Sequence, residues 1–226
     1  MDEKKTVMSQ AKKDMNEIDP RLNIIYSHII WYISEYPESA SKGRGKNSPE
    51  PLSSEYIKEN AHKFYQARLP KKPKPPATIP DEVVSIILDE YFNVPNKSLQ
   101  RAKKEHLLSM GAEGLVGDLI ERYLSSIMEA HGWLWCAGAI IRGVDFIKPP
   151  GNENHSWTLL QVKNSDNSEN SSSSAIREGT EIKKWFRRFS RRADSNWDNF
   201  PDDKIKHLLS EKDFIIFVRS YLKKIK

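Results

Sequence analysis

The stretch IIRGVDFIKPPGNENHSWTLLQVK, residues 140–163, has the pattern of two neighbouring strands joined by a turn. Residues 139–147 are rich in β-branched side chains, and residues 157–163 form an apolar run. Between them, Pro149-Pro150-Gly151-Asn152 is a strong turn signal. The stretch therefore predicts a β-hairpin, and the rest of the fold is built around it.

Three polar residues stand at corresponding ends of the two expected strands: Asp145, Gln161 and Lys163. Side chains alternate along a strand, so Gln161 and Lys163 share one face. When the strands pair, Asp145 and Lys163 converge. We therefore expect an acid, a second oxygen ligand and a lysine at one edge of a sheet.

The whole chain has 226 residues and a net charge of +5, and it is long enough to bury a substantial core without disulfides. Its single cysteine, Cys136, cannot form an internal disulfide. No apolar run approaches bilayer length, and the start, MDEKKTVMSQAKK, lacks the apolar core of a secretory signal. We expect a cytoplasmic protein without a membrane segment. The six histidines are dispersed, which disfavours a zinc site.

Apolar residues at helical spacing predict helices over residues 21–36 and 113–131. Helices are also predicted over residues 55–68, capped by Ser53 or Ser54, over residues 82–92, capped by Asp81, and over residues 98–109. Residues 4–16 carry only a thin apolar stripe, which predicts a frayed or docked helix. An amphipathic helix is expected around residues 178–189, and a final buried strand over residues 213–222. The pair 82–92 and 98–109 has the spacing of a helical hairpin, which we expect to pack in the core. A helix-turn-helix is the weaker interpretation.

The helix over residues 113–131 carries acids that can reach the hairpin. Glu113, Gly117 and Glu121 lie on one face at spacings of four, and Asp118 lies beside them. Gly132 is a natural stop, after which the chain enters the first expected strand. This order brings Glu121 near Asp145.

Basic residues gather in clusters at 71–74, 97–104, 183–192 and 223–226. Such clusters suit a polyanion, although solvated helix faces are the alternative for any one of them. The loop over residues 39–51 adds Lys42, Arg44 and Lys46, which could reach a phosphate. A flexible linker is the alternative there.

Asp145 followed by Gln161-Val162-Lys163 resembles the PD-(D/E)XK nuclease motif. In that motif an acid on one strand and an acid plus a lysine on the next bind a divalent metal and position water. Two departures stand out: Val144 replaces the motif proline, and the neutral Gln161 replaces the second acid. The site is therefore short of one negative ligand. Glu121 is the preferred replacement, with Asp118, Glu169 and Glu113 as alternatives.

A wider resemblance lies in GLVGDLIERYLSSI, GVDFIKPP and LLQVKNSDNSENSSSSAIREGT. These segments are similar to the SinI and AvaII type of type II restriction endonuclease. The resemblance implies a homodimeric, Mg²⁺-dependent endonuclease that cuts double-stranded DNA within GGWCC. It also implies a functional partner, a methyltransferase that protects host DNA.

On this basis we predict an α/β protein. Residues 111–226 form a restriction-endonuclease-like core with a central mixed β-sheet flanked by helices. Residues 1–110 form a mainly helical region with basic and proline-rich loops, which serves DNA contact, dimerisation or both.

The resemblance and the side-chain chemistry assign roles to two sets of residues. The expected catalytic residues are Asp145, Gln161, Lys163 and Glu121, and the expected metal ligands are Asp145, Gln161, Glu121 and the backbone carbonyl of Val162. Base readout is placed in the loop after the second strand, at Asn164, Asp166, Asn167, Asn170 and Arg177. Contacts to the DNA backbone are assigned to Lys183, Lys184, Arg187 and Arg188.

Two other functions fit the same residues. The first is a non-catalytic DNA-binding protein on a nuclease fold that has lost its metal site, as the neutral Gln161 would allow. The second is a repair or junction-cleaving nuclease without sequence-specific readout. Retention of both Asp145 and Lys163 favours an active enzyme.

Overall fold

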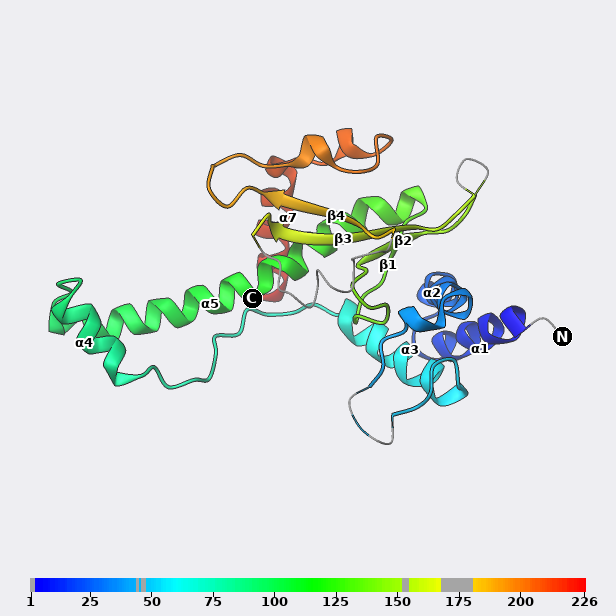
Figure 1. The fold of residues 1–226 in the computed structure, drawn as a ribbon, viewed down its shortest axis with the longest axis horizontal. Coiled ribbons are helices and arrows are strands. Elements are labelled where there is room, and N and C mark those ends of the chain that lie inside the picture. Colours follow the sequence, from blue (N-terminus) through cyan, green and yellow to red (C-terminus); the bar gives the residue numbers. More distant parts are fainter. Residues whose placement is uncertain (1–2, 44, 46–47, 152–154, 168–180) are drawn as a thin grey trace.

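A computed structural model gives the structure of the chain and describes residues 3–43, 45, 48–151, 155–167 and 181–226. Helices α1 to α3 form one lobe, and a sheet with α7 beside it forms another (Figure 1). A long helix, α5, runs past the sheet, and its first half projects away from both lobes together with α4 (Figure 1). The molecule is therefore a two-lobed body with a helical arm.

The first lobe consists of α1 (Glu3–Ile18), α2 (Asn23–Glu35) and α3 (Ser54–Arg68). These helices confirm the first three that the sequence predicts. Their shared interior includes Ala11, Met15, Ile30 and Phe64, all without exposed surface. Ser53 caps α3, because its hydroxyl accepts a hydrogen bond from the Tyr56 N–H.

The sheet consists of β1 (Leu134–Trp135), β2 (Phe146–Lys148), β3 (Thr158–Ser165) and β4 (Lys183–Arg188), in the order β1-β2-β3-β4. β1–β2 and β2–β3 are antiparallel, whereas β3–β4 is parallel. A mixed sheet in an α/β protein was predicted and is confirmed. The predicted hairpin is confirmed as well, with Phe146 opposite Leu160 and Lys148 opposite Thr158. Asn152 of the expected turn lies outside the described residues.

The first strand of the hairpin is much shorter than predicted. Residues 139–147 were expected to be extended, but β2 begins only at Phe146. Gly138, Ala139 and Gly143 have positive φ angles, so the chain turns repeatedly before it enters the sheet. These turns place Asp145 immediately before β2 rather than inside a long strand.

The helix predicted around residues 178–189 is wrong for its described part, because residues 183–188 form β4. From Lys184 to Arg188 the exposure alternates. Trp185 and Arg187 are buried, whereas Lys184 and Phe186 are half-buried and Arg188 is exposed. This alternation is that of a strand. Pairing with β3 decided the outcome over a local pattern that also fitted a helix.

The final strand predicted over residues 213–222 is also wrong, since α7 spans Glu211–Ile225. The apolar run contains Phe214, Phe217, Val218 and Tyr221 at helical spacing, and these residues pack against the core. Ser210 caps the helix by accepting a hydrogen bond from the Asp213 N–H.

The two helices predicted over residues 98–109 and 113–131 are one helix, α5 (Asn96–Met128). The boundary expected after residue 110 therefore falls inside a continuous helix. Gly111 lies where the proline-rich segment crosses α5, and a Cβ there would stand 2.8 Å from the Pro75 backbone nitrogen. At this position glycine permits the crossing.

The predicted helix 82–92 exists as α4 (Glu82–Glu90), capped by Asp81 as expected. Its expected place in the core is wrong, because none of its residues is buried. α4 packs against α5, at the far end of the arm (Figure 1). Among the described residues, no helix combines the length and apolar character that spanning a bilayer requires.

Candidate active site

Asp145 is fixed against the strand that carries the other motif residues. Its backbone N–H donates to the Leu160 carbonyl at 2.9 Å, and its own carbonyl accepts from the Cys136 N–H at 2.8 Å. The carboxylate Oδ2 accepts from the Val162 N–H at 2.7 Å. The Asp145 carboxylate therefore lies beside the backbone of β3, at the residue between Gln161 and Lys163.

The electrostatics of Asp145 reflect this position. Burial raises the pKa of its carboxyl to about 6, while the Val162 N–H and the Lys163 charge act in the opposite direction. The Lys163 ammonium is thus close enough to stabilise the ionised form. The structure brings together the acid and the lysine that the sequence placed on two strands.

Glu121 approaches the same place from α5. The Trp135 indole N–H, on β1, donates to Glu121 Oε2 at 2.8 Å. Burial and, as the second cause, the charge of Asp145 raise the pKa of Glu121 to about 8. Although part of the Glu121 residue is exposed, its carboxyl is desolvated and faces a second carboxyl.

The pKa of the buried Cys136 thiol also shows that Asp145 and Glu121 lie close together. Its pKa is raised first by burial and then by the charge of Asp145, with a further contribution from Glu121. Both carboxyls therefore lie around one point, where β1, β2 and α5 meet. Cys136 itself is a buried free thiol.

The alternative acids are placed differently. Asp118 binds Arg122 at 2.5 Å and Lys71 at 2.7 Å. Arg122 also donates to the backbone carbonyls of residues 67–69, so this pair ties the end of α3 to α5. Glu113 is exposed and accepts from the Ser109 hydroxyl at 3.4 Å, and Glu169 lies outside the described residues. The geometry favours Glu121 over Asp118 as the partner of Asp145.

The β3–β4 register shows which basic residues share a face with the motif. Lys184 is paired with Gln161, Phe186 with Lys163, and Arg188 with Ser165. Residues paired in register project from the same side of a sheet. Lys184 and Arg188 therefore project from the face that carries Gln161 and Lys163. The helix expected over residues 178–189 gives no indication that these basic residues share a face with Gln161 and Lys163.

Arg187 projects from the other face and is buried. Its guanidinium donates to Glu211 at 2.5 Å and twice to Asn164 Oδ1, at 3.1 and 3.0 Å. It also lies over the Phe214 ring, 5.0 Å from the centroid. In this conformation Arg187 and Asn164 bind each other and anchor α7, which does not favour the DNA contacts predicted for them.

Two other residues predicted to read DNA, Asp166 and Asn167, directly follow β3. Asp166 accepts from the Ser190 N–H at 2.8 Å, and hydrogen bonds of this kind lower the pKa of its carboxyl. Asn167 is exposed beside it. Asn170 and Arg177 lie outside the described residues, and Lys183 is exposed on β4.

The residues at the Asp145 site fit a divalent cation. Two desolvated carboxyls repel each other, and their raised pKa values show that ionising both is costly without a counter-charge. Gln161 and the Val162 carbonyl would add neutral oxygens, as Mg²⁺ accepts. The described part of the chain contains no cluster of three or more acidic, histidine or cysteine ligands.

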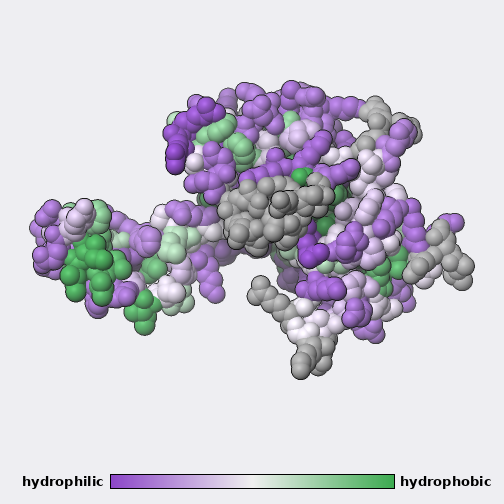
Figure 2. All heavy atoms as spheres, viewed as in Figure 1, coloured by the Kyte–Doolittle hydropathy of each residue, from purple (hydrophilic) through white to green (hydrophobic). Residues whose placement is uncertain are grey.

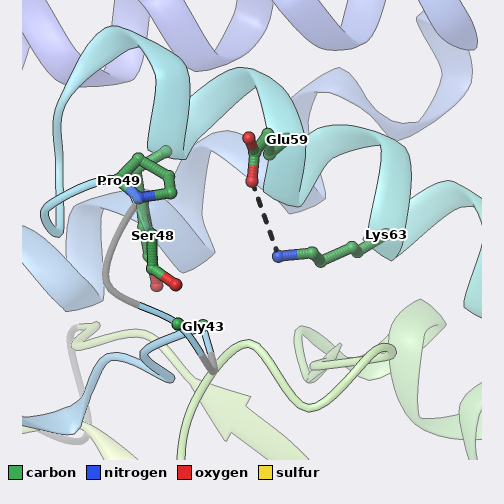
Figure 3. A pocket seen from close by; sticks show the side chains of 7 residues that line it. Gly43, Ser48, Pro49, Glu59 and Lys63 are labelled. Atoms are coloured by element: carbon green, nitrogen blue, oxygen red, sulfur yellow. Dashed lines mark ion pairs between the residues drawn. The ribbon is translucent and has the colours of Figure 1, made fainter.

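A different hollow, of about 350 Å³, lies between α3 and the loop that contains Gly43 and Ser48 (Figure 3). Glu59 and Lys63 of α3 line it and form an ion pair at 3.9 Å (Figure 3). A lone acid already paired with a lysine offers no charge for a metal. We therefore place the candidate active site at Asp145 and not here.

The Trp135 contact and the Arg187–Asn164–Glu211 cluster were not identified from the sequence. A buried tryptophan needs an acceptor for its N–H, which signals that some carboxylate or carbonyl lies nearby. The sequence does not say which one. The identity of the acceptor depends on how α5 packs over β1.

The chain has a four-stranded mixed sheet that carries a carboxyl and a lysine, and a second carboxyl reaches them from a helix. This arrangement is consistent with a nuclease-like fold. Comparison with known proteins gives the family. Residues 7–224 match the SinI restriction endonuclease family, and the chain belongs to it. This confirms the predicted enzyme class, a type II restriction endonuclease.

Two relatives cover nearly the full length. The chain is 50% identical to the type II restriction enzyme Eco47I of Escherichia coli over 216 residues, which is 95% of this chain and 94% of the relative. It is 51% identical to the type II restriction enzyme SinI of Salmonella infantis over 217 residues, 96% and 94% of the two chains. The similarity includes the N-terminal lobe and the arm as well as the sheet.

Proposed function

We propose that this restriction endonuclease hydrolyses both strands of double-stranded DNA at GGWCC, with Mg²⁺ as its cofactor. The observation that carries the proposal is the Asp145 carboxylate bound to the β3 backbone between Gln161 and Lys163, with Glu121 beside it. Family membership supports the reaction class. The site sequence rests on the resemblance of the hairpin and the loop after it to the SinI and AvaII type.

Asp145 and Glu121 would hold the metal, with Gln161 and the Val162 carbonyl as neutral ligands. When bound, Mg²⁺ supplies a counter-charge for the phosphate and lowers the pKa of a coordinated water. Lys163 lies next to Asp145, so its ammonium can orient the attacking water and stabilise the charge that develops on the phosphate oxygens. Water forms the new P–O bond, and the P–O bond to the sugar oxygen breaks.

The contacts to DNA follow from the face on which each basic residue lies. Lys184 and Arg188 share the face of Gln161 and Lys163, so we propose that they bind the phosphates flanking the cut. The loop after β3 supplies the base contacts, with Asn167 exposed at its start. Asn170 and Arg177, farther along that loop, remain candidates on side-chain chemistry alone.

A near-palindromic site calls for a two-fold protein, because each strand needs one active site. We therefore propose a homodimer, with the central A or T tolerated through few contacts or shape readout. A methyltransferase of the same specificity would protect the host DNA. A cytoplasmic location, which the unpaired Cys136 favours, completes the proposal.

Digestion of phage DNA in Mg²⁺ tests the function directly. A restriction enzyme gives discrete bands, and bands whose ends map to GGWCC support the proposed site. A smear would indicate an unspecific nuclease of the same fold, and intact DNA under all metal conditions would indicate a binding protein. DNA fully methylated at GGWCC is the matched control and should stay uncut.

A further inference from the structure

The helical arm, residues 79–110, exposes an unusually apolar surface. α4 is an apolar helix, yet none of its residues is buried. Its five aliphatic side chains cover about 200° of the helix circumference at 100° per residue, roughly twice the stripe that packing against one neighbour needs. A single contact with α5 therefore leaves much of this helix without a partner.

The exposed apolar side chains of the arm are adjacent rather than scattered. Figure 2 shows them as a concentrated hydrophobic region on the arm, in contrast to the largely polar body. Each has between 43% and 95% of its surface exposed: Ile79, Val83, Val84, Ile86, Ile87, Tyr91, Phe92, Leu108 and Met110. We call this set the arm patch.

The size of the arm patch fits a protein interface. Its side chains expose about 600 Å² of apolar surface, taking about 60–120 Å² for an aliphatic and about 150–250 Å² for an aromatic side chain. The largest patch on a typical monomer measures about 300–600 Å². A standard interface buries about 800 Å² per partner, of which about two thirds is apolar in homodimers. The arm patch alone supplies that apolar share.

The charges of the arm are complementary to those of a second arm. Asp81 and the helix α4 that follows it carry only acidic charges: Asp81, Glu82, Asp89 and Glu90. The start of α5 is mainly basic: Lys97, Arg101, Lys103 and Lys104, with Glu105 as the exception. Within one arm Lys103 pairs with Glu82 at 3.3 Å and Arg101 with Glu105 at 2.7 Å. The charges outside these two ion pairs are Asp81, Asp89 and Glu90 on one side and Lys97 and Lys104 on the other. A two-fold contact that sets α4 of one copy against α5 of the other opposes unlike charges twice. The same contact with DNA would bring the acids of α4 against phosphates.

A hollow between the two arm helices offers a place for a partner side chain. It has a volume of about 460 Å³ and is lined mainly by apolar groups, among them Pro80, Val84, Leu88, Leu107 and Met110. Aromatic residues at the arm tip, Tyr91 and Phe92, are 77% and 62% exposed. Such anchors entering an apolar hollow are typical of interface centres.

We propose that the arm is the dimerisation element: two copies of this chain join arm to arm, as a four-helix packing in which α4 of each protomer lies against α5 of its partner. This inference assigns an interface to the homodimer of the proposed function. It rests on the proposed function only because DNA cleavage at a near-palindromic site explains why a dimer is needed. The contact is isologous, so it closes at two copies.

Sedimentation equilibrium of the protein without DNA or metal tests the proposal. The wild type is expected to be a dimer, and Ile86→Glu is expected to raise the dimer dissociation constant at least about a hundred-fold, because two charges enter one apolar contact. The matched control is Ile216→Glu on α7, since Ile86 and Ile216 are similarly exposed at 58% and 52%. This control should stay dimeric.

A cross-linking experiment guards against a folding defect in the charged variant. Cys136 is the only cysteine and is buried, so Phe92→Cys creates a single accessible thiol at the arm tip. A short bifunctional maleimide should join two copies of Phe92→Cys efficiently at low protein concentration. Ile216→Cys, modified to the same extent, should remain a single chain.

Three results would overturn the proposal. These are a monomeric wild type, an Ile86→Glu dimer as tight as the wild-type dimer, and equal cross-linking of the two cysteine variants. Loss of DNA affinity by Ile86→Glu without any change in mass would assign the arm to DNA instead. Because sedimentation and cross-linking are carried out without DNA, their failure leaves the cleavage chemistry untouched, and it is distinguishable from failure of the nuclease itself.

Discussion

Glu121 and Asp145 each carry a carboxyl whose pKa is raised, and both lie at one site. For Glu121 the folded-state pKa of about 8 exceeds its ordinary value of 4.5. The folded protein therefore binds more protons than the unfolded chain between these values, and this group makes stability fall as pH rises from about 4.5 to about 8. The proposed Mg²⁺ would relieve the repulsion between the two carboxyls.

Replacement of Glu121 by glutamine removes the charge and keeps an oxygen for the Trp135 N–H. We expect Glu121→Gln to raise the melting temperature of the metal-free protein at pH 8, by about 2–4 °C for each kcal/mol of penalty removed. The gain should shrink toward pH 5. Thermal unfolding in EDTA at the two pH values measures it. An equal shift at both would show that the carboxyl is not desolvated.

The choice among the candidate acids is tested by a second pair of variants. We expect Glu121→Gln to abolish the Mg²⁺-induced rise in melting temperature and to abolish cleavage, whereas Glu169→Gln retains both. Lys163→Ala should lose cleavage yet keep the Mg²⁺ effect, since it is not a ligand. If Glu169→Gln alone loses the Mg²⁺ effect, the metal is held from the loop and the ligand set is wrong.

The basic residues of strand β4 lie in two different environments, one buried and one exposed to solvent. Arg187 is buried against Glu211 and Asn164, whereas its neighbour Arg188 is exposed on the opposite face. We expect Arg187→Ala to destabilise the protein by about 2–4 kcal/mol, because it leaves partly buried acceptors unpaired. Arg188→Ala should change stability by less than about 0.5 kcal/mol. Chemical denaturation of both variants distinguishes them.

DNA binding should show the reverse order. Because Arg188 is proposed to bind a phosphate, we expect Arg188→Ala to lower the affinity for DNA and to reduce the salt slope of binding by about one. Arg187→Ala, once folded, should keep the wild-type slope. A smaller slope for Arg187→Ala than for Arg188→Ala would contradict the assignment of these two residues to opposite faces.

The glycines of α5 give a second matched comparison. A Cβ at residue 111 would meet the Pro75 backbone at 2.8 Å, whereas at Gly114 and Gly117 it would meet nothing within 4 Å. We expect Gly111→Ala to lower stability by about 1–3 kcal/mol through displacement of the crossing segment. Gly114→Ala should stabilise by about 0.5–1 kcal/mol, the usual gain in an exposed helix. Urea denaturation measures both, and a stabilising Gly111→Ala would show that residues 69–80 do not hold this position.

The elements that the sequence predicted well are those with local signals. Ser53 and Asp81 cap helices where expected, and the apolar run ending at Lys163 is a buried strand. Residues 183–188 and 211–225 were assigned the wrong way round, since bulky apolar residues fit either period over such short runs. Pairing with β3 and packing on α5 settle these elements, and both are long-range effects.

The residues of the candidate site also differ in whether local sequence or tertiary packing determines their positions. Asp145, Gln161 and Lys163 were predictable because they belong to one hairpin, whose pairing fixes their distance. The position of Glu121 depends on α5 and Trp135, and that of Arg187 depends on α7. Residues joined by tertiary packing leave little trace in a single sequence.

The three proposed functions lie in separate parts of the molecule. The proposed catalytic residues lie on the sheet and near the end of α5, and the proposed phosphate contacts, Lys184 and Arg188, lie on one face of β4. The arm at the other end of α5 exposes the surface proposed for a second copy. Because α5 is one continuous helix, it connects the arm directly to Glu121. The distance between two active sites in a dimer would thus be set by the length of this helix.

The most direct test of the active site is the single-turnover cleavage rate of Asp145→Asn on a duplex with one GGWCC site, in Mg²⁺. Binding to the same duplex is measured alongside in Ca²⁺. We predict a rate at least about a thousand-fold below that of the wild type, with binding to the site retained. Cleavage by Asp145→Asn within about ten-fold of the wild-type rate would contradict the assignment of this site.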